Sequence, residues 1–118
     1  MDSTNVLEKA AALAEMEFGE LAKFNQGQVG VFWTEGGPES SPWEMHPDDD
    51  ELLHVLEGEL ILTVLTDDGP VETRVPAGSL FVVPRGCWHK QRIPVRTCEL
   101  YVTPGRSLHS TADDPRIE

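Results

Sequence analysis

The sequence predicts an all-β fold, an antiparallel sandwich or barrel, with a short N-terminal helix in front of it. Three observations support this prediction. Short segments with β-strand patterning recur from Gln28 to about residue 103, turns with Gly or Pro separate them, and helical spacing of apolar residues is confined to the first quarter of the chain. The 118 residues are enough for one domain with one hydrophobic core.

The expected helix comes first. Residues 2–5 (Asp-Ser-Thr-Asn) offer several N-cap side chains. Behind them, apolar residues recur at helical spacing at Leu7, Ala11, Ala14 and Phe18. We therefore expect an amphipathic helix that ends near Glu17.

The β pattern begins at Gln28, where Val29, Val31 and Trp33 alternate with other residues before a Gly-Gly-Pro sequence at 36–38. Further strands are expected at residues 42–47, 51–57, 59–66, 71–75, 79–83, 87–93 and 96–103. Turns that contain Gly or Pro separate most of them. These features divide the chain into an N-terminal helix and lead-in segment (1–27), a β-barrel (28–105) and a polar C-terminal tail (106–118) that we expect to be loosely ordered.

The formal net charge of −12 bears on which partners the protein can bind. An acidic surface repels phosphate backbones and anionic lipids, so we expect neither a nucleic acid nor a membrane partner. Five of the nine Lys and Arg residues lie between residues 74 and 96, where they either attract a small anionic ligand or balance nearby acids. Cys87 and Cys98 form no CxxC or disulfide pattern, and no secretory signal is visible, so the expected location is the reducing cytoplasm.

Ligand-type side chains concentrate in two places. In the first, Glu44 and His46 point to one face of a strand because side chains alternate, and a short turn at 47–50 returns Glu51 beside them. In the second, His89 follows a Pro-Arg-Gly turn at the start of another strand. Two imidazoles and one or two carboxylates inside a barrel suit a first-row divalent cation, and binding one satisfies groups that are costly to bury.

These two segments resemble the two motifs of the cupin family, G-x5-H-x-H-x3,4-E-x6-G and G-x5-P-x-G-x2-H-x3-N. The positions that match are His46, Glu51 and Gly58 in the first motif and Gly78, Pro84, Gly86 and His89 in the second. Among cupins, the chain is most similar to the short, single-domain bacterial proteins labelled mannose-6-phosphate isomerase-like. The resemblance implies a jelly-roll β-barrel, a metal ion near its axis and, frequently, a homodimer.

The chain departs from the motifs at three positions. Glu44 replaces the first motif histidine, Pro38 the first glycine and Ile93 the final asparagine. Either Glu44 supplies an oxygen ligand in place of the histidine, or it hydrogen-bonds a neighbour or fills the pocket mouth. The predicted ligands of one divalent ion per chain (Fe, Mn, Zn or Ni) are His46, Glu51, His89 and, in the first case, Glu44.

For four further side chains, the sequence predicts less specific roles. His54 lies three residues after Glu51, on the opposite face of its strand, and is expected to be packed or at the surface. Cys87 is expected to be a small buried residue. Gln91 shares a face with His89 and either contacts the site or belongs to the core, and His109 in the tail is expected to have no specific role.

Three function classes fit these features. The first is a metalloenzyme of the oxygenase, isomerase or lyase type that acts on a small polar molecule. The second is a non-catalytic module that binds or senses a metal or a small ligand, and the third is a metal-free structural cupin. The retained second motif argues against the third class, whereas the first two need the same ligands. We also expect a homodimer, for which Phe18, Phe32 and Trp33 are interface candidates that equally suit a core.

Overall fold

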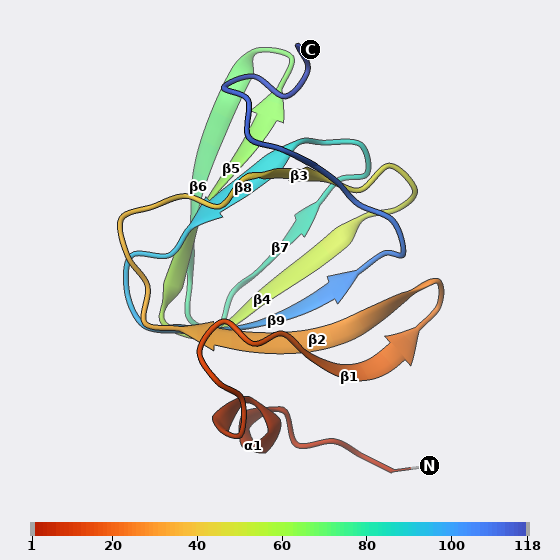
Figure 1. Ribbon diagram of the computed structural model, residues 1–118, viewed down its shortest axis with the longest axis vertical. Helices are drawn as coiled ribbons and strands as arrows, with labels where there is room; N and C mark the ends of the chain where they lie inside the picture. Colours follow the sequence, from red (N-terminus) through yellow and green to blue (C-terminus); the bar gives the residue numbers. More distant parts are fainter. Residues whose placement is uncertain (1, 118) are drawn as a thin grey trace.

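The computed structural model describes residues 2–117 and contains one short helix and two five-stranded antiparallel sheets (Figure 1). The elements are α1 (Val6–Ala11), β1 (Gly19–Phe24), β2 (Gly27–Thr34), β3 (Trp43–Met45), β4 (Glu51–Glu57), β5 (Glu59–Thr66), β6 (Gly69–Pro76), β7 (Leu80–Val83), β8 (His89–Arg92), β9 (Thr97–Thr103) and β10 (Leu108–Ser110). Within residues 2–117, no helix is both long and apolar enough to cross a membrane.

The two sheets form the expected jelly-roll β-barrel. The first sheet has the strand order β1-β2-β9-β4-β7 and the second the order β10-β3-β8-β5-β6. From β3 to β9 the chain passes repeatedly from one sheet to the other, as it does in a jelly roll. The main core lies between the sheets, where Phe32 and Leu53 of the first sheet meet Leu60 and Leu62 of the second.

Strands β2 to β9 confirm the segments that the sequence predicts. In β4, for example, Glu51, Leu53 and Val55 are buried, whereas Leu52 and His54 between them are only half-buried. This alternation is the local signal of a strand that covers a core with one face. The turns also agree, since Gly58, Gly78 and others of the expected turn positions adopt positive φ angles.

The helix is shorter than the sequence predicts. The Asn5 side chain caps its first turn, but the helix ends at Ala11 and does not reach Glu17. Met16 has a φ angle of 63°, which a helix does not permit, and its backbone N–H donates to the carbonyl of Trp33 at 2.9 Å. Pairing with the barrel therefore replaces helical hydrogen bonding in this segment.

Two strands lie outside the predicted set. β1 falls in the lead-in segment and pairs with β2, although its burial shows no sustained alternation. β10 falls in the tail and pairs with β3, so the expected loose order is wrong for Leu108–Ser110. β1 forms a hairpin with the next strand, in which Phe24 pairs with Gly27. β10 is stabilised by backbone pairing with a strand far away in the chain, for which a local sequence pattern has no signal. Met1 and Glu118, the ends of the two expected terminal segments, lie outside the described residues.

Helix α1 packs on the outer face of the first sheet, beside β2 (Figure 1). Ala10 contacts Val31 and Cys98 there, and Trp33 packs against this cluster with its indole N–H donating to the carbonyl of Leu13 at 2.9 Å. Phe32 points to the opposite face and is buried in the main core. Phe32 is therefore a core residue of a single chain, whereas Trp33 is half-buried on the outer face of the first sheet.

Candidate metal centre

The four predicted ligand residues meet between the two sheets. Glu44 lies in β3, His46 follows its end, Glu51 begins β4 and His89 begins β8. Glu44 and His89 are directly paired in the β3–β8 ladder. One ligand atom of each residue lies within 4.8 Å of the corresponding atoms of the other three. His46, Glu51 and His89 are buried and Glu44 is half-buried, so this cluster is largely shielded from water.

Two loops place the histidines. The backbone N–H of Arg85 donates to the Asp50 carboxylate at 2.8 Å, and the N–H of Gly86 donates to the carbonyl of His46 at 2.8 Å. These bonds tie the turn before His89 to the loop that follows His46. Gly86 has a φ angle of 79°, a left-handed conformation that favours glycine and that explains its place in the second motif.

Both imidazoles face the same two carboxylates through their Nε2 atoms. His46 Nε2 lies 3.0 Å from Glu44 Oε1 and 3.2 Å from Glu51 Oε2. His89 Nε2 lies 3.1 Å from Glu51 Oε1 and 3.4 Å from Glu44 Oε1. The four side chains thus surround one point with two nitrogen and two carboxylate donors.

Backbone carbonyls hold the other ring nitrogens. His46 Nδ1 donates to the carbonyl of Arg106 at 3.2 Å, and His89 Nδ1 donates to the carbonyl of Cys87 at 3.1 Å. A carbonyl oxygen only accepts, so each Nδ1 bears the proton. In the neutral imidazole, Nε2 then has a lone pair directed at the centre, which is how proteins orient a metal-binding histidine.

The charges of the four groups balance. Burial by itself lowers the pKa of both imidazoles, but hydrogen bonds to Glu44 and Glu51 outweigh it and raise the pKa of His46 to about 10 and that of His89 to about 9. The same hydrogen bonds overcome burial at Glu44 and Glu51 and lower the pKa of both carboxyl groups. Two imidazolium protons neutralise two carboxylates, and a divalent cation neutralises them equally when it displaces both protons. The donor set therefore fits a divalent metal ion.

The structure places His109 beside Glu44, which differs from the sequence expectation. The tail residue was expected to have no specific role, yet its Nε2 lies 2.9 Å from Glu44 Oε2, and the two residues are paired in the β10–β3 ladder. Glu44 is thus held between His46 and His109. Both interpretations of Glu44, as a ligand and as a partner of its neighbours, fit this geometry. The sequence gives no local signal for His109, because its position depends on a pairing with a strand far away in the chain.

The other singled-out residues lie outside the cluster. His54 is half-buried on the opposite face of β4 and its Nδ1 donates to the carbonyl of Ser79 at 3.0 Å, as expected of a packed imidazole. Cys87 is half-buried and packs against the main core. Thr103, which the sequence does not single out, donates its hydroxyl hydrogen to Glu51 and supports that carboxylate.

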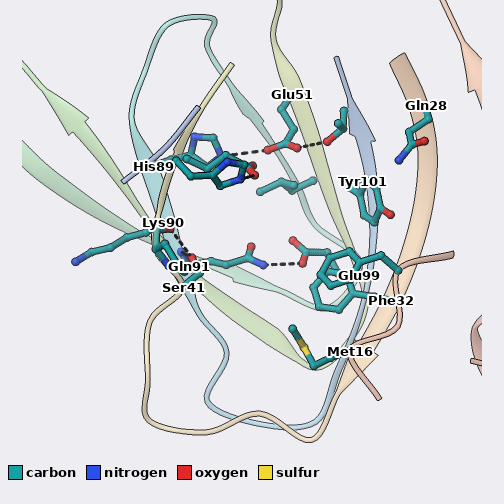
Figure 2. A pocket seen from close by; sticks show the side chains of 16 residues that line it. Met16, Gln28, Phe32, Ser41, Glu51, His89, Lys90, Gln91, Glu99 and Tyr101 are labelled. Atoms are coloured by element: carbon teal, nitrogen blue, oxygen red, sulfur yellow. Dashed lines mark hydrogen bonds and ion pairs between the residues drawn. The ribbon is translucent and has the colours of Figure 1, made fainter. Parts of the chain in front are cut away.

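A cavity of about 460 Å³ adjoins the cluster (Figure 2). Glu44, Glu51 and His89 line it together with apolar side chains, among them Phe32 and Tyr101. Gln91 and Glu99 point toward one another across it, and the amide of Gln91 donates to Glu99 Oε2 at 3.1 Å. Gln91 is therefore a cavity residue, one of the two roles that the sequence leaves open.

Glu99 is a cavity residue that sequence reasoning misses. Its side chain is 1% exposed, on the face of β9 that also buries Thr97 and Tyr101. Burial raises the pKa of its carboxyl group to about 8; the hydrogen bond from Gln91 opposes this effect and the negative charges of Glu51 and Glu44 add to it. A charged residue at an inward-facing position of a strand is the signal that identifies it.

Comparisons with known proteins agree with this architecture. A model of the cupin domain matches residues 31–103. The chain is 44% identical over 61 residues to the uncharacterized protein YdbB of Bacillus subtilis (strain 168); the match covers 51% of this chain and only 50% of that protein.

Two solved structures share the fold. A cupin-2 domain containing protein from Shewanella frigidimarina NCIMB 400 superposes with a TM-score of 0.71 at 24% identity, over 86% of this chain and 93% of the other. Hydroquinone 1,2-dioxygenase from Sphingomonas sp. TTNP3, with 4-hydroxybenzoate bound, superposes with a TM-score of 0.64 at 18% identity, over 85% and 73%.

Proposed function

Since the chain belongs to the cupin domain family, we propose that it is a metal-dependent enzyme that holds one divalent ion per chain and acts on a small molecule in the adjoining cavity. His46, Glu51, His89 and Glu44 are the proposed ligands. The main support is the orientation of the imidazoles: each Nδ1–H donates to a backbone carbonyl, and each Nε2 faces the carboxylates.

The donors set the chemistry of the site. Two nitrogen and two oxygen donors suit Fe, Mn, Zn or Ni, and they lean away from Cu. A bound ion would supply Lewis acidity, or an oxygen-binding centre, to a substrate atom beside it. The protein residues orient the ligands, exclude water from three of the four, and neutralise the charge of a dication with two carboxylates.

The cavity favours a catalytic site over a closed structural one. Its volume of about 460 Å³ lies within the range of pockets that bind small molecules, and three of the proposed ligands line it. The dioxygenase that shares this fold supports oxygenation as the first reaction class to assay, with isomerase and lyase chemistry next. The mannose-6-phosphate isomerase-like resemblance stays a prediction.

A non-catalytic binding or sensing module is the second candidate. Four protein donors are sufficient to complete a tetrahedral shell, and such a closed shell is typical of structural zinc sites. Protein loaded with Co²⁺ separates the two candidates. A visible absorption spectrum that changes when azide is added indicates an exchangeable position and supports the enzyme, whereas an unchanged spectrum supports the binding module.

Elemental analysis of protein purified without chelators tests the proposal directly. We expect close to one divalent ion per chain in the wild type and in His54→Ala, which removes a half-buried imidazole from the opposite face of β4. We expect negligible metal in His46→Ala and His89→Ala. Retention of the metal by either of these two variants would contradict the proposed ligand set.

A homodimer through the outer face of the first sheet belongs to the same proposal. Helix α1 covers part of this face. Beyond the helix, Leu80 and Val82 on edge strand β7 are 58% and 45% exposed, and Leu52 of β4 lies between Val82 and Val102 in the sheet register. A contiguous apolar surface on an edge strand is suited to contact with a second copy of the chain.

A further inference from the structure

The carboxyl group of Glu99 has an unused oxygen inside the cavity. Its Oε2 accepts the hydrogen bond from Gln91, whereas Oε1 is the one buried side-chain oxygen or nitrogen within residues 2–117 that has no hydrogen-bond partner. Buried polar groups are nearly always paired, because an unpaired group has lost its hydrogen bonds to water without gaining others. A group of this kind that lines a cavity points to a ligand atom as its partner.

The chemical state of Glu99 defines that partner. The surrounding apolar side chains disfavour the carboxylate, and the raised pKa of Glu99 keeps most of the group protonated at neutral pH. Burial is the largest cause of this shift and does not depend on the charge of the metal cluster. Since Oε2 accepts from Gln91, the hydroxyl hydrogen is on Oε1. The group therefore donates, and its partner is an acceptor atom of the ligand.

The walls of the cavity select a flat, apolar ligand body. Phe32 stacks on Phe18 with ring centroids 4.4 Å apart, and Tyr101 lies tilted 6.3 Å from Phe32. All three rings line the cavity, and rings of this kind pack well against another aromatic ring. The end of the ligand beside Glu99 is also uncharged: Lys90, the one Lys or Arg among the described residues that line the cavity, extends away from it (Figure 2) and lies over the Trp43 ring.

We propose that Glu99 is the specificity-determining residue of the cavity, and that it donates a hydrogen bond to an uncharged carbonyl or hydroxyl oxygen of a small aromatic ligand whose other end lies at the metal cluster. Gln91 positions the carboxyl group through its contact with Oε2. In Figure 2 the hydrogen-bonded pair of Gln91 and Glu99 lies below Glu51 and His89, which places the two polar ends of the ligand apart. This assignment rests on the proposed function, since it names the substrate class of that site.

Two probes of matched shape test the assignment. Both 4-hydroxyacetophenone and 4-isopropylphenol have a phenol ring, but only the first has a carbonyl acceptor at the opposite end. Calorimetric titration of the metal-loaded wild type is expected to show about tenfold tighter binding of the ketone, the effect of one hydrogen bond to a buried group. Glu99→Gln keeps an uncharged donor and is expected to retain most of this preference. Glu99→Leu is expected to abolish it.

Two further variants complete the design. His54→Ala removes a half-buried imidazole on the opposite face of β4, outside the cavity, and is expected to bind both probes as the wild type does. If Glu99→Leu does not fold, as judged by circular dichroism, Glu99→Met provides the same comparison. Equal binding of the two probes by the wild type, no binding of either probe, or a preserved preference in the Leu or Met variant would each overturn the assignment.

Metal content and ligand preference are measured separately. The titrations are repeated on chelator-treated protein, where the contact with Glu99 is still present and the ketone is still expected to bind more tightly. If the chain binds no metal but keeps the preference, the proposed metal function fails and the role of Glu99 stands. If the metal is bound with the expected stoichiometry and the preference is missing, the role of Glu99 fails and the proposed metal function stands.

Discussion

Glu44 and His109 form a hydrogen bond of 2.9 Å between Oε2 and Nε2, and they are directly opposed in the β3–β10 ladder. The residue that replaces the first motif histidine is thus restrained by a histidine from another part of the chain. Glu44 Oε1, in contrast, faces His46 and His89. One oxygen of this carboxylate is directed at the proposed metal position and the other at its support.

The first prediction concerns Glu44 itself. If it is a ligand, Glu44→Gln lowers the metal affinity at least tenfold, because a neutral amide is a poorer ligand for a dication. Glu44→His restores the motif and keeps the metal, with a shift in preference toward metals that favour nitrogen. Competition titration with a chelator measures both effects, and His89→Ala is the reference for complete loss. Unchanged affinity in Glu44→Gln would leave His46, His89 and Glu51 as the ligands.

The second prediction concerns His109. His109→Ala frees one side of Glu44 and is expected to weaken metal binding roughly tenfold, the usual effect of losing a residue that orients a ligand. His109→Gln keeps a donor of similar reach and should restore part of the affinity. Arg116→Ala, a change in the same C-terminal segment at a residue that contacts Asp114 and not Glu44, is the control. An affinity equal to the wild type in His109→Ala would assign the contact to surface packing alone.

The third prediction is a pH dependence of stability caused by Glu99. Its pKa is raised from an ordinary value of 4.5 to about 8 in the folded state, so between these pH values the folded protein binds more protons than the unfolded chain. The free energy of unfolding therefore falls as the pH rises from about 4.5 to 8, by an amount on the order of a few kcal/mol.

Glu99→Gln tests this dependence because the amide does not titrate. Denaturant unfolding of chelator-treated protein is expected to show the variant close to the wild type near pH 4.5 and more stable than the wild type at pH 9. Glu72→Gln removes an exposed glutamate of β6 and should reproduce the slope of the wild type. Parallel pH profiles for the wild type and Glu99→Gln would show that Glu99 is not the source of the effect.

The fourth prediction concerns assembly. Light scattering at micromolar concentration is expected to give the mass of a dimer for the wild type. Leu80→Glu or Val82→Glu places a charge on the exposed apolar face of β7 and is expected to give a monomer. Val71→Glu alters a residue of β6 that is 50% exposed on the other sheet, and it should remain dimeric. A monomeric wild type would reject the homodimer.

The sequence predicts the elements whose signal is local. Strands β2 to β9 show alternation or Gly and Pro turns, and each lies where its pattern indicates. The pattern at Leu7, Ala11 and Ala14 predicts too long a helix, because the pairing of Met16 with β2 competes with helical hydrogen bonding. β10 has no local signal at all, since three partly polar residues become a strand only beside β3.

The residues of the candidate site also differ in how far the sequence predicts them. Strand alternation and the resemblance to the two motifs single out Glu44, His46, Glu51 and His89, and the structure brings these four side chains together. The roles of Glu99 and His109 depend on where β9 and β10 lie in the sheets, which no spacing specifies. Alternation along the strand can single out Glu99, but only the long-range pairing of β9 and β10 shows which residues Glu99 and His109 contact.

The position of β9 between β2 and β4 has a consequence for protein synthesis. Gln28 pairs with Thr103 and Thr34 with Thr97, so β2 leaves the ribosome long before its partner has been made. Until β9 emerges, β2 and β4 each have an unpaired edge, and the nascent chain is exposed to contacts with other chains. The first sheet is consequently complete only after β9 has been made. The orientation of His46 requires a residue beyond β9, because the backbone carbonyl that accepts from its Nδ1 belongs to Arg106.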